Sequence, residues 1–151
     1  MDIIVKESFS VIGMEGSTAD GADFVPRLWE KANGRFSEVE ALAARDADGC
    51  LIGVWGAMSD LARRFLPWEK DFTQGLYLAG VECRPDAQPP EGWVKWQLPG
   101  FEYLRIPVGD NAFKEGLQTV ADAGYTLAGA VQDFTDPNTG MSYMLFPIRK
   151  L

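Results

Sequence analysis

The order of the predicted secondary-structure elements is the feature that most constrains the fold of this 151-residue chain. Runs of apolar and β-branched residues, broken by Gly, Pro and Asp turns, predict two groups of elements. The first group is a strand, a helix and two strands, at residues 3–14, 23–33, 51–57 and 76–83. The second group repeats this order, at residues 93–97 with 101–108, 110–124, 127–134 and 141–148. The repeat predicts two similar modules, about 1–84 and 93–151, packed as one domain.

Local signals set the predicted ends of the helices. Pro26 is tolerated in the first turn of the first helix, and Asp110 or Asn111 is expected to cap the second helix, which ends before Gly124. The spacing of Ser37 and Glu40 is that of a capping box, which predicts a short further helical piece. We therefore expect an α+β fold in which the helices cover one face of antiparallel sheets.

Charge and the absence of histidine exclude several classes of function. The chain has 22 acidic and 14 basic residues, for a formal net charge of -8, and its basic residues are scattered, so we expect no direct nucleic-acid binding. Without histidine there is no His-dependent hydrolase and no His-ligated metal site. Cys50 and Cys83 form no CxxC pair, so we predict buried, reduced thiols, no metal site and no cofactor.

The amino terminus carries charges where a signal peptide needs an apolar stretch, and no apolar run is long enough to span a membrane. We therefore predict a cytoplasmic protein without a membrane partner. The first predicted strand begins at residue 3, so we expect no DNA-binding helix-turn-helix before it.

Aromatic residues are the most informative residue class, with five Trp, four Tyr and nine Phe. Several lie on or beside the central predicted strands, where the two modules would meet: Trp55, Trp68, Tyr77, Trp93, Trp96, Tyr103 and Tyr143. Two interpretations stay open. These rings either form an aromatic core or line a cavity, since Tyr and Trp combine an apolar body with a polar handle.

Glu82 ends an otherwise apolar strand and shares a face with Leu78 and Gly80 by period-two alternation. It lies either at a solvent-facing strand end or where it meets a cation. Tyr77 falls on the opposite face unless a bulge at Gly80 intervenes. Glu102 has the same ambiguity as Glu82. A further alternative is that the strand-end arginines Arg84 and Arg105 pair with Glu82 or Glu102 and neutralise it, which would leave the site structural.

Four runs taken in order resemble one known family. They extend from Leu51 to Gly56, from Tyr77 to Glu82, from Phe101 to Pro107 and from Met144 to Ile148, and Leu28 with Trp29 adds to them. The chain resembles the GyrI-like domains, which are the effector-binding domains of AraC-type and MerR-type transcription activators and also occur as free-standing proteins. The resemblance covers nearly the whole chain.

The resemblance implies duplicated SHS2-type modules with a ligand cleft between the halves, lined by aromatic rings and closed by a carboxylate. The expected lining residues are Trp55, Tyr77, Glu82, Trp96, Phe101, Tyr103, Phe134 and Tyr143. Two positions depart from the family pattern, because Tyr143 and Thr135 stand where multidrug-binding members often have Glu. Glu82 is then either the substitute counter-ion, or the pocket has no buried charge.

We predict a free-standing protein that binds a bulky, apolar, aromatic ligand, either neutral or cationic, as multidrug-binding members do. One alternative that the resemblance implies is a hydrolase of electrophilic cyclopropane-type natural products, with Glu82 and Tyr103 as the candidate catalytic residues. Another is a gyrase-inhibitor-like regulator that binds a protein partner through its acidic surface. The sequence specifies neither the ligand nor the oligomeric state.

Overall fold

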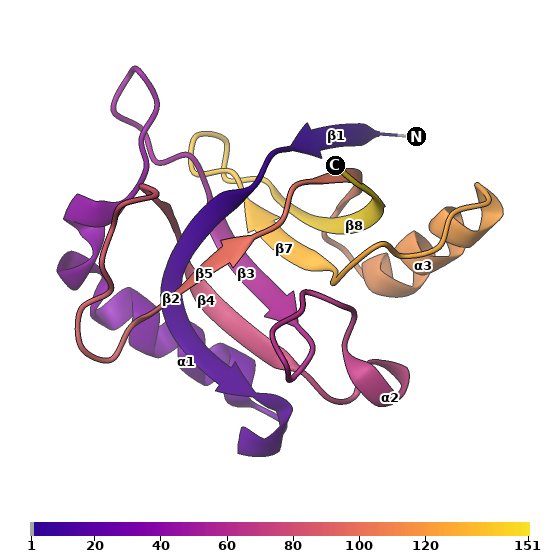
Figure 1. Cartoon of the computed structure of the whole chain (residues 1–151), viewed down its shortest axis with the longest axis horizontal. Helices are drawn as coiled ribbons and strands as arrows, with labels where there is room; N and C mark the ends of the chain where they lie inside the picture. Colours follow the sequence, from indigo (N-terminus) through magenta and orange to yellow (C-terminus); the bar gives the residue numbers. More distant parts are fainter. Residues whose placement is uncertain (1) are drawn as a thin grey trace.

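The computed structural model describes residues 2–151 and contains one eight-stranded sheet in which all paired strands are antiparallel. The strands are β1 (Ile3–Lys6), β2 (Phe9–Ser17), β3 (Val54–Ser59), β4 (Leu76–Cys83), β5 (Val94–Leu98), β6 (Phe101–Pro107), β7 (Gln132–Thr135) and β8 (Ser142–Lys150). Their order in the sheet is β1-β6-β8-β7-β3-β4-β2-β5 (Figure 1). The sheet curls into a half-barrel.

The strand order repeats between the two halves of the chain. The first half contributes β2-β4-β3 and the second half β6-β8-β7, and the two triplets meet where β3 pairs with β7. The strand that precedes each triplet in the sequence pairs with the other half: β1 of the first half pairs with β6, and β5 of the second half pairs with β2. The predicted repeat of elements is thereby confirmed, with one difference: the two halves share one continuous sheet.

Two helices of eleven residues, α1 (Phe24–Gly34) and α3 (Ala112–Asp122), cover the same face of the sheet, which we call the outer face (Figure 1). Helix α1 packs on β2 and β4, and α3 packs on β6 and β8. The opposite, inner face carries a third buried cluster contributed by strands from both halves. The prediction of helices on one face is confirmed.

Several predicted boundaries differ from the structure. The first predicted strand is divided at residues 7–8, because β1 leaves the first half to pair with β6. The predicted strand at 127–134 is regular only from Gln132, and the helical piece after Ser37 is replaced by 3-10 turns, Phe36–Glu38 and Glu40–Leu42. Asn111 does precede α3, but its side chain makes no capping hydrogen bond.

Two further segments were not predicted, a 3-10 turn (Thr18–Asp20) and the four-residue α2 (Glu69–Phe72). In α2 the residues Lys70, Asp71 and Phe72 have φ values of 48°, 58° and 62°. Non-glycine residues rarely adopt this left-handed conformation, which costs roughly 1–2 kcal/mol per residue. The α2 segment is therefore held in place by its surroundings and not by its own preference.

Candidate functional site

The structure separates the eight predicted lining residues onto two faces of the sheet. Tyr77 points toward α1 on the outer face. The others lie on the inner face: Trp55, Glu82, Trp96, Phe101, Tyr103, Phe134 and Tyr143. The register of β4 runs through Gly80 without a bulge, so Tyr77 and Glu82 stay on opposite sides. The eight predicted lining residues therefore do not all face one cleft, because Tyr77 lies on the other side of the sheet.

An apolar cavity of about 250 Å³ lies on the outer face where the two halves meet, and we call it the seam cavity. Its walls come from both halves: Met58, Pro67, Trp68, Phe72, Phe113 and Val131. The α2 segment and the residues before it supply three of these walls. The ring of Phe72 packs edge-on against Phe113 of α3, with 5.1 Å between the centroids. The strained segment thus closes one side of the cavity.

A chain of three polar side chains adjoins the seam cavity. The indole nitrogen of Trp29 donates to the hydroxyl of Tyr77 at 3.0 Å, and that hydroxyl donates to Asp133 Oδ2 at 3.2 Å. The register places them beside the cavity wall, because Tyr77 pairs with Met58 and Asp133 pairs with Gly56. A Cβ at Gly56 would collide with the Tyr77 hydroxyl, so this position requires glycine.

Burial sets the protonation of the Asp133 carboxyl group. Loss of solvent raises its pKa to about 6, against a smaller lowering by the hydrogen bond from Tyr77. Burial and the charge of Asp133 also raise the pKa of Tyr77, which keeps the phenol protonated as a donor. No salt bridge to Asp133 occurs within residues 2–151. The aromatic walls of the seam cavity thus adjoin a carboxyl group that has no counter-ion among the described residues.

Phe72 and Phe113, which line the seam cavity, and Asp133 and Trp29, which adjoin it, were not among the predicted lining residues. A signal for Asp133 was present, since it alternates with Val131 in a predicted strand, which is the pattern that drew attention to Glu82. Phe72 had no comparable signal, because the left-handed α2 segment matches no regular periodicity.

On the inner face, Glu82 has partners supplied by the chain itself. Lys6 Nζ lies 2.9 Å from Glu82 Oε2, and the indole nitrogen of Trp55 donates to Oε1 at 3.1 Å. The Glu82 side chain is 8% exposed and that of Lys6 is 26% exposed. The alternative that placed Glu82 at a solvent-facing strand end is therefore wrong.

The arginine alternative for these carboxylates is also wrong. Arg84 pairs with Asp86, and Arg105 pairs with Asp2 and stacks on the ring of Tyr143. Glu102 pairs with Arg149, one strand away on β8.

Tyr103 is fully buried, and burial raises its pKa. Its hydroxyl group and the indole nitrogen of Trp96 are buried without a hydrogen-bond partner among the described residues. No hydrogen bond links Tyr103 to Glu82 within that part of the chain, so the two candidate catalytic side chains do not form a pair.

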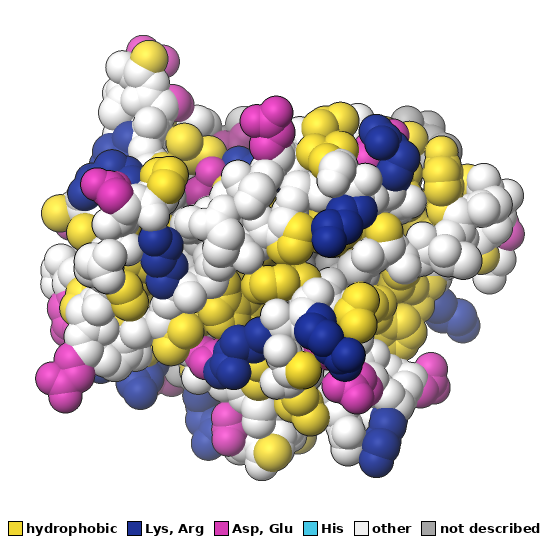
Figure 2. Space-filling model, in the orientation of Figure 1, with side chains coloured by type: hydrophobic (Ala, Val, Ile, Leu, Met, Phe, Trp, Pro, Cys, Tyr) yellow, Lys and Arg dark blue, Asp and Glu magenta, His cyan; other side chains and the backbone are white. Residues whose placement is uncertain are grey.

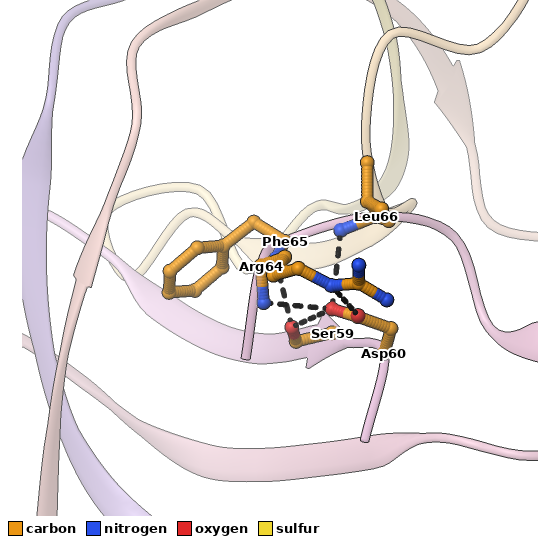
Figure 3. Close-up of polar contacts among 5 residues, drawn as sticks. All are labelled: Ser59, Asp60, Arg64, Phe65 and Leu66. Carbon is orange, nitrogen blue, oxygen red and sulfur yellow. Dashed lines mark hydrogen bonds and ion pairs between the residues drawn. The ribbon is translucent and has the colours of Figure 1, made fainter. Parts of the chain in front are cut away.

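Residues 60–66 form a loop over the inner face that is anchored by a buried carboxylate (Figure 3). Asp60 accepts hydrogen bonds from Ser59 Oγ, from the backbone and guanidinium of Arg64, and from the Leu66 N–H. Burial alone would raise the pKa of Asp60, but these bonds together hold it below its ordinary value. The Phe65 ring points away from these polar contacts and packs edge-on against Trp96, 5.8 Å between centroids.

Solved structures share this arrangement of elements. SAV2435, solved bound to tetraphenylphosphonium, has a TM-score of 0.65 and 13% identity over 98% of this chain and 93% of that one. The C-terminal domain of EcmrR has a TM-score of 0.67 and 11% identity over 99% and 97% of the two chains. The chain has the GyrI-like fold.

The match to whole EcmrR, solved with DNA, covers 99% of this chain and 57% of the EcmrR chain, with a TM-score of 0.67 and 12% identity. No protein-family model and no curated protein matches the sequence. The GyrI-like fold is thus shown by three-dimensional structure, and it agrees with the resemblance carried by the four short runs.

Two further observations concern other predictions. No helix within residues 2–151 is long and apolar enough to cross a membrane. In the same residues no three Cys, Asp or Glu side chains cluster as metal ligands, and Cys83 is buried whereas Cys50 is half-buried. The prediction that both thiols are buried therefore holds only for Cys83.

Proposed function

We propose that this protein binds bulky, aromatic, cationic small molecules in the seam cavity, with Asp133 as the counter-ion. The observation that carries the proposal is the half-buried Asp133 carboxyl group, which adjoins the aromatic walls of the cavity. Among residues 2–151 it has one hydrogen bond and no salt bridge. A ligand cation there would complete an ion pair, and the surrounding rings would add cation–π attraction of roughly 0.5–2 kcal/mol each. The proposed counter-ion is therefore Asp133, whereas the sequence-based expectation was Glu82.

The known neighbours support this class of ligand. SAV2435 was solved with tetraphenylphosphonium, which is an aromatic cation, and the EcmrR domain belongs to a protein solved on DNA. We infer an effector-type, multidrug-like binding role for this chain from the shared fold and from the chemistry of its own seam residues.

The present cavity is small for such a ligand. Pockets for drug-sized molecules usually measure roughly 300–1,000 Å³, whereas the seam cavity measures about 250 Å³. We propose that the α2 segment moves outward on binding, because its left-handed residues store strain that this movement releases. Phe72 would then leave Phe113 and widen the entrance.

A fluorescence titration with tetraphenylphosphonium tests this function. Binding in the seam is expected to quench Trp29 or Trp68 emission, and Asp133→Asn is expected to weaken binding at least about tenfold, or about 1.4 kcal/mol. Glu82→Gln on the inner face is the matched control and should leave affinity unchanged. Equal affinities of wild type and Asp133→Asn would overturn the proposal.

The hydrolase alternative has less support, because its candidate pair, Glu82 and Tyr103, makes no direct bond. The gyrase-inhibitor alternative and a protein partner stay predictions, and so does the cytoplasmic location.

A further inference from the structure

We propose that the protein has a second small-molecule site, for a neutral two-ring aromatic molecule with one polar group, in a cavity beneath helix α1. This cavity, which we call the helix cavity, measures about 210 Å³ and shares no lining residue with the seam cavity. Its walls come from α1, β3, β4 and the segments beside them, and not from the contact between β3 and β7. The proposal therefore does not depend on the function proposed above.

The walls of the helix cavity are aromatic and aliphatic. Three rings contribute to them: Trp29, Phe36 and Trp93. The deep end is closed by small, buried side chains: Ala32, Val39 and Val81. The cavity lies beneath α1, behind β2 in the view of Figure 1, whereas the face toward the viewer in Figure 2 carries charged side chains of both signs among hydrophobic ones. Protein interiors leave few voids larger than a water molecule, so an apolar space of this size has room for a guest.

Hydrogen bonds outside the cavity hold its two indole walls in place. Trp29 Nε1 donates to the Tyr77 hydroxyl at 3.0 Å, and Trp93 Nε1 donates to Glu38 Oε1 at 3.1 Å. Neither acceptor lines the cavity, so each indole has its polar atom satisfied elsewhere while its ring forms a wall. Walls that are fixed before a ligand arrives lose little conformational freedom on binding, which favours affinity.

The charges near the helix cavity select a neutral guest. None of the described residues that line it is charged. The neighbouring carboxylate, Glu38, forms a salt bridge of 2.8 Å with Arg35, and the hydrogen bonds from Arg35 and Trp93 lower the pKa of Glu38. Glu38 is thus ionised and already paired, so a ligand cation in this cavity would gain no counter-ion and would lose its hydration.

Volume and the residues at the mouth define the guest further. An apolar cavity of about 150 Å³ binds benzene, so the helix cavity, at about 210 Å³, has room for a second fused ring. Asn33 is the exposed residue among those that line the cavity, and it marks the side that is open to water. Its amide offers a donor and an acceptor to one polar group on the guest.

Indole is a suitable probe, because it is neutral, has two fused rings and carries one N–H group. We would follow the indole N–H signals of the five Trp residues by nitrogen–proton NMR, with Trp93 and Trp68 assigned from their Phe variants. Indole is expected to shift the Trp93 signal saturably, with a dissociation constant of about 1 mM or below, and to leave Trp68 of the seam cavity unchanged. Ala32→Leu fills the cavity and should weaken binding at least about tenfold. The matched control is Ala121→Leu, at an exposed position of α3, which should bind as wild type does.

The proposal is overturned if the Trp93 signal shows no saturable shift up to about 10 mM indole, or if folded Ala32→Leu binds indole as well as wild type. If Ala32→Leu does not fold, the wild-type pattern decides, and a shift of Trp68 without one of Trp93 then overturns the proposal. Asp133→Asn separates the two sites: indole binding is expected to be unchanged in it, and its loss there would place the probe in the seam cavity instead.

Discussion

The two faces of the sheet each hold a carboxyl group among aromatic rings, but among residues 2–151 only one of these groups forms a salt bridge. On the inner face Glu82 has the Lys6 ammonium and the Trp55 indole. On the outer face Asp133 accepts a hydrogen bond from the Tyr77 hydroxyl and has no other polar partner among the described residues, and burial raises its pKa to about 6. An external cation can form an ion pair with Asp133 without displacing a cation of the protein, whereas at Glu82 it would first have to displace Lys6.

Packing also differs between the two faces. The inner cluster is closely filled, with Trp55 2% exposed and Tyr103 fully buried. The seam keeps a cavity whose wall is a strained segment. Four predictions, each made with one or two variants, would break or sharpen this contrast.

The largest expected effect is on the inner face. Trp55→Ala removes a fully buried ring and a donor to Glu82, so it is expected to lower the free energy of unfolding by about 3–5 kcal/mol. Trp29→Ala, which removes a half-buried ring on the outer face, should cost about 1–2 kcal/mol. Urea unfolding of both variants measures the difference, and equal losses would contradict the contrast in packing.

Lys6→Met comes next. It leaves the buried Glu82 carboxylate without its cation and should lower the free energy of unfolding by about 2 kcal/mol, less than for a fully buried pair because Lys6 is partly exposed. Adding Glu82→Gln should recover most of this loss. If the double variant is no more stable than Lys6→Met, the ion pair does not account for the effect.

Asp133→Asn, in contrast to Trp55→Ala and Lys6→Met, should raise the free energy of unfolding. A carboxyl group whose pKa is raised in the folded state binds protons more tightly there than in the unfolded chain, so its contribution to stability falls as pH rises from about 4 to about 7. The variant should therefore be about 1–2 kcal/mol more stable than wild type at pH 8 and equal to it near pH 4. Thermal unfolding across this range checks the sign, and a constant difference at all pH values would contradict it.

The smallest expected effect concerns the strain in α2. Asp71→Gly replaces an exposed residue with φ 58° and should stabilise the chain by about 0.5–1 kcal/mol. Lys114→Gly, at an exposed position in the regular helix α3, should destabilise it by about 1 kcal/mol. Loss of stability in both variants would show that the α2 conformation is not strained.

Much of the fold could be predicted from local sequence. The strand at 76–83 matches β4 residue for residue, because a strand buried on both faces is a continuous apolar run. Helix α1 begins within one residue of its predicted start, since apolar spacing and Pro26 mark its first turn. The exchange of β1 and β5 between the halves could not be predicted, because short strands do not specify distant partners.

The site was less predictable than the fold. Period-two alternation separates Tyr77 from Glu82, and this correctly indicated two faces, but it did not say which face would keep a cavity. The partner of Glu82 lies 76 positions away in sequence, and only the three-dimensional structure brings Lys6 to it. Asp133 likewise has no salt bridge among residues 2–151 because the neighbouring elements place no Lys or Arg side chain beside it.

The most direct test is the pH dependence of the dissociation constant for tetraphenylphosphonium in wild type and Asp133→Asn. If the ligand cation pairs with Asp133, affinity should rise as pH increases from 5 to 7, through the pKa of about 6, and then level off, while the variant stays weak and flat. Affinity that is independent of pH, or that rises equally in both proteins, would contradict the assignment of the seam carboxyl group as the counter-ion.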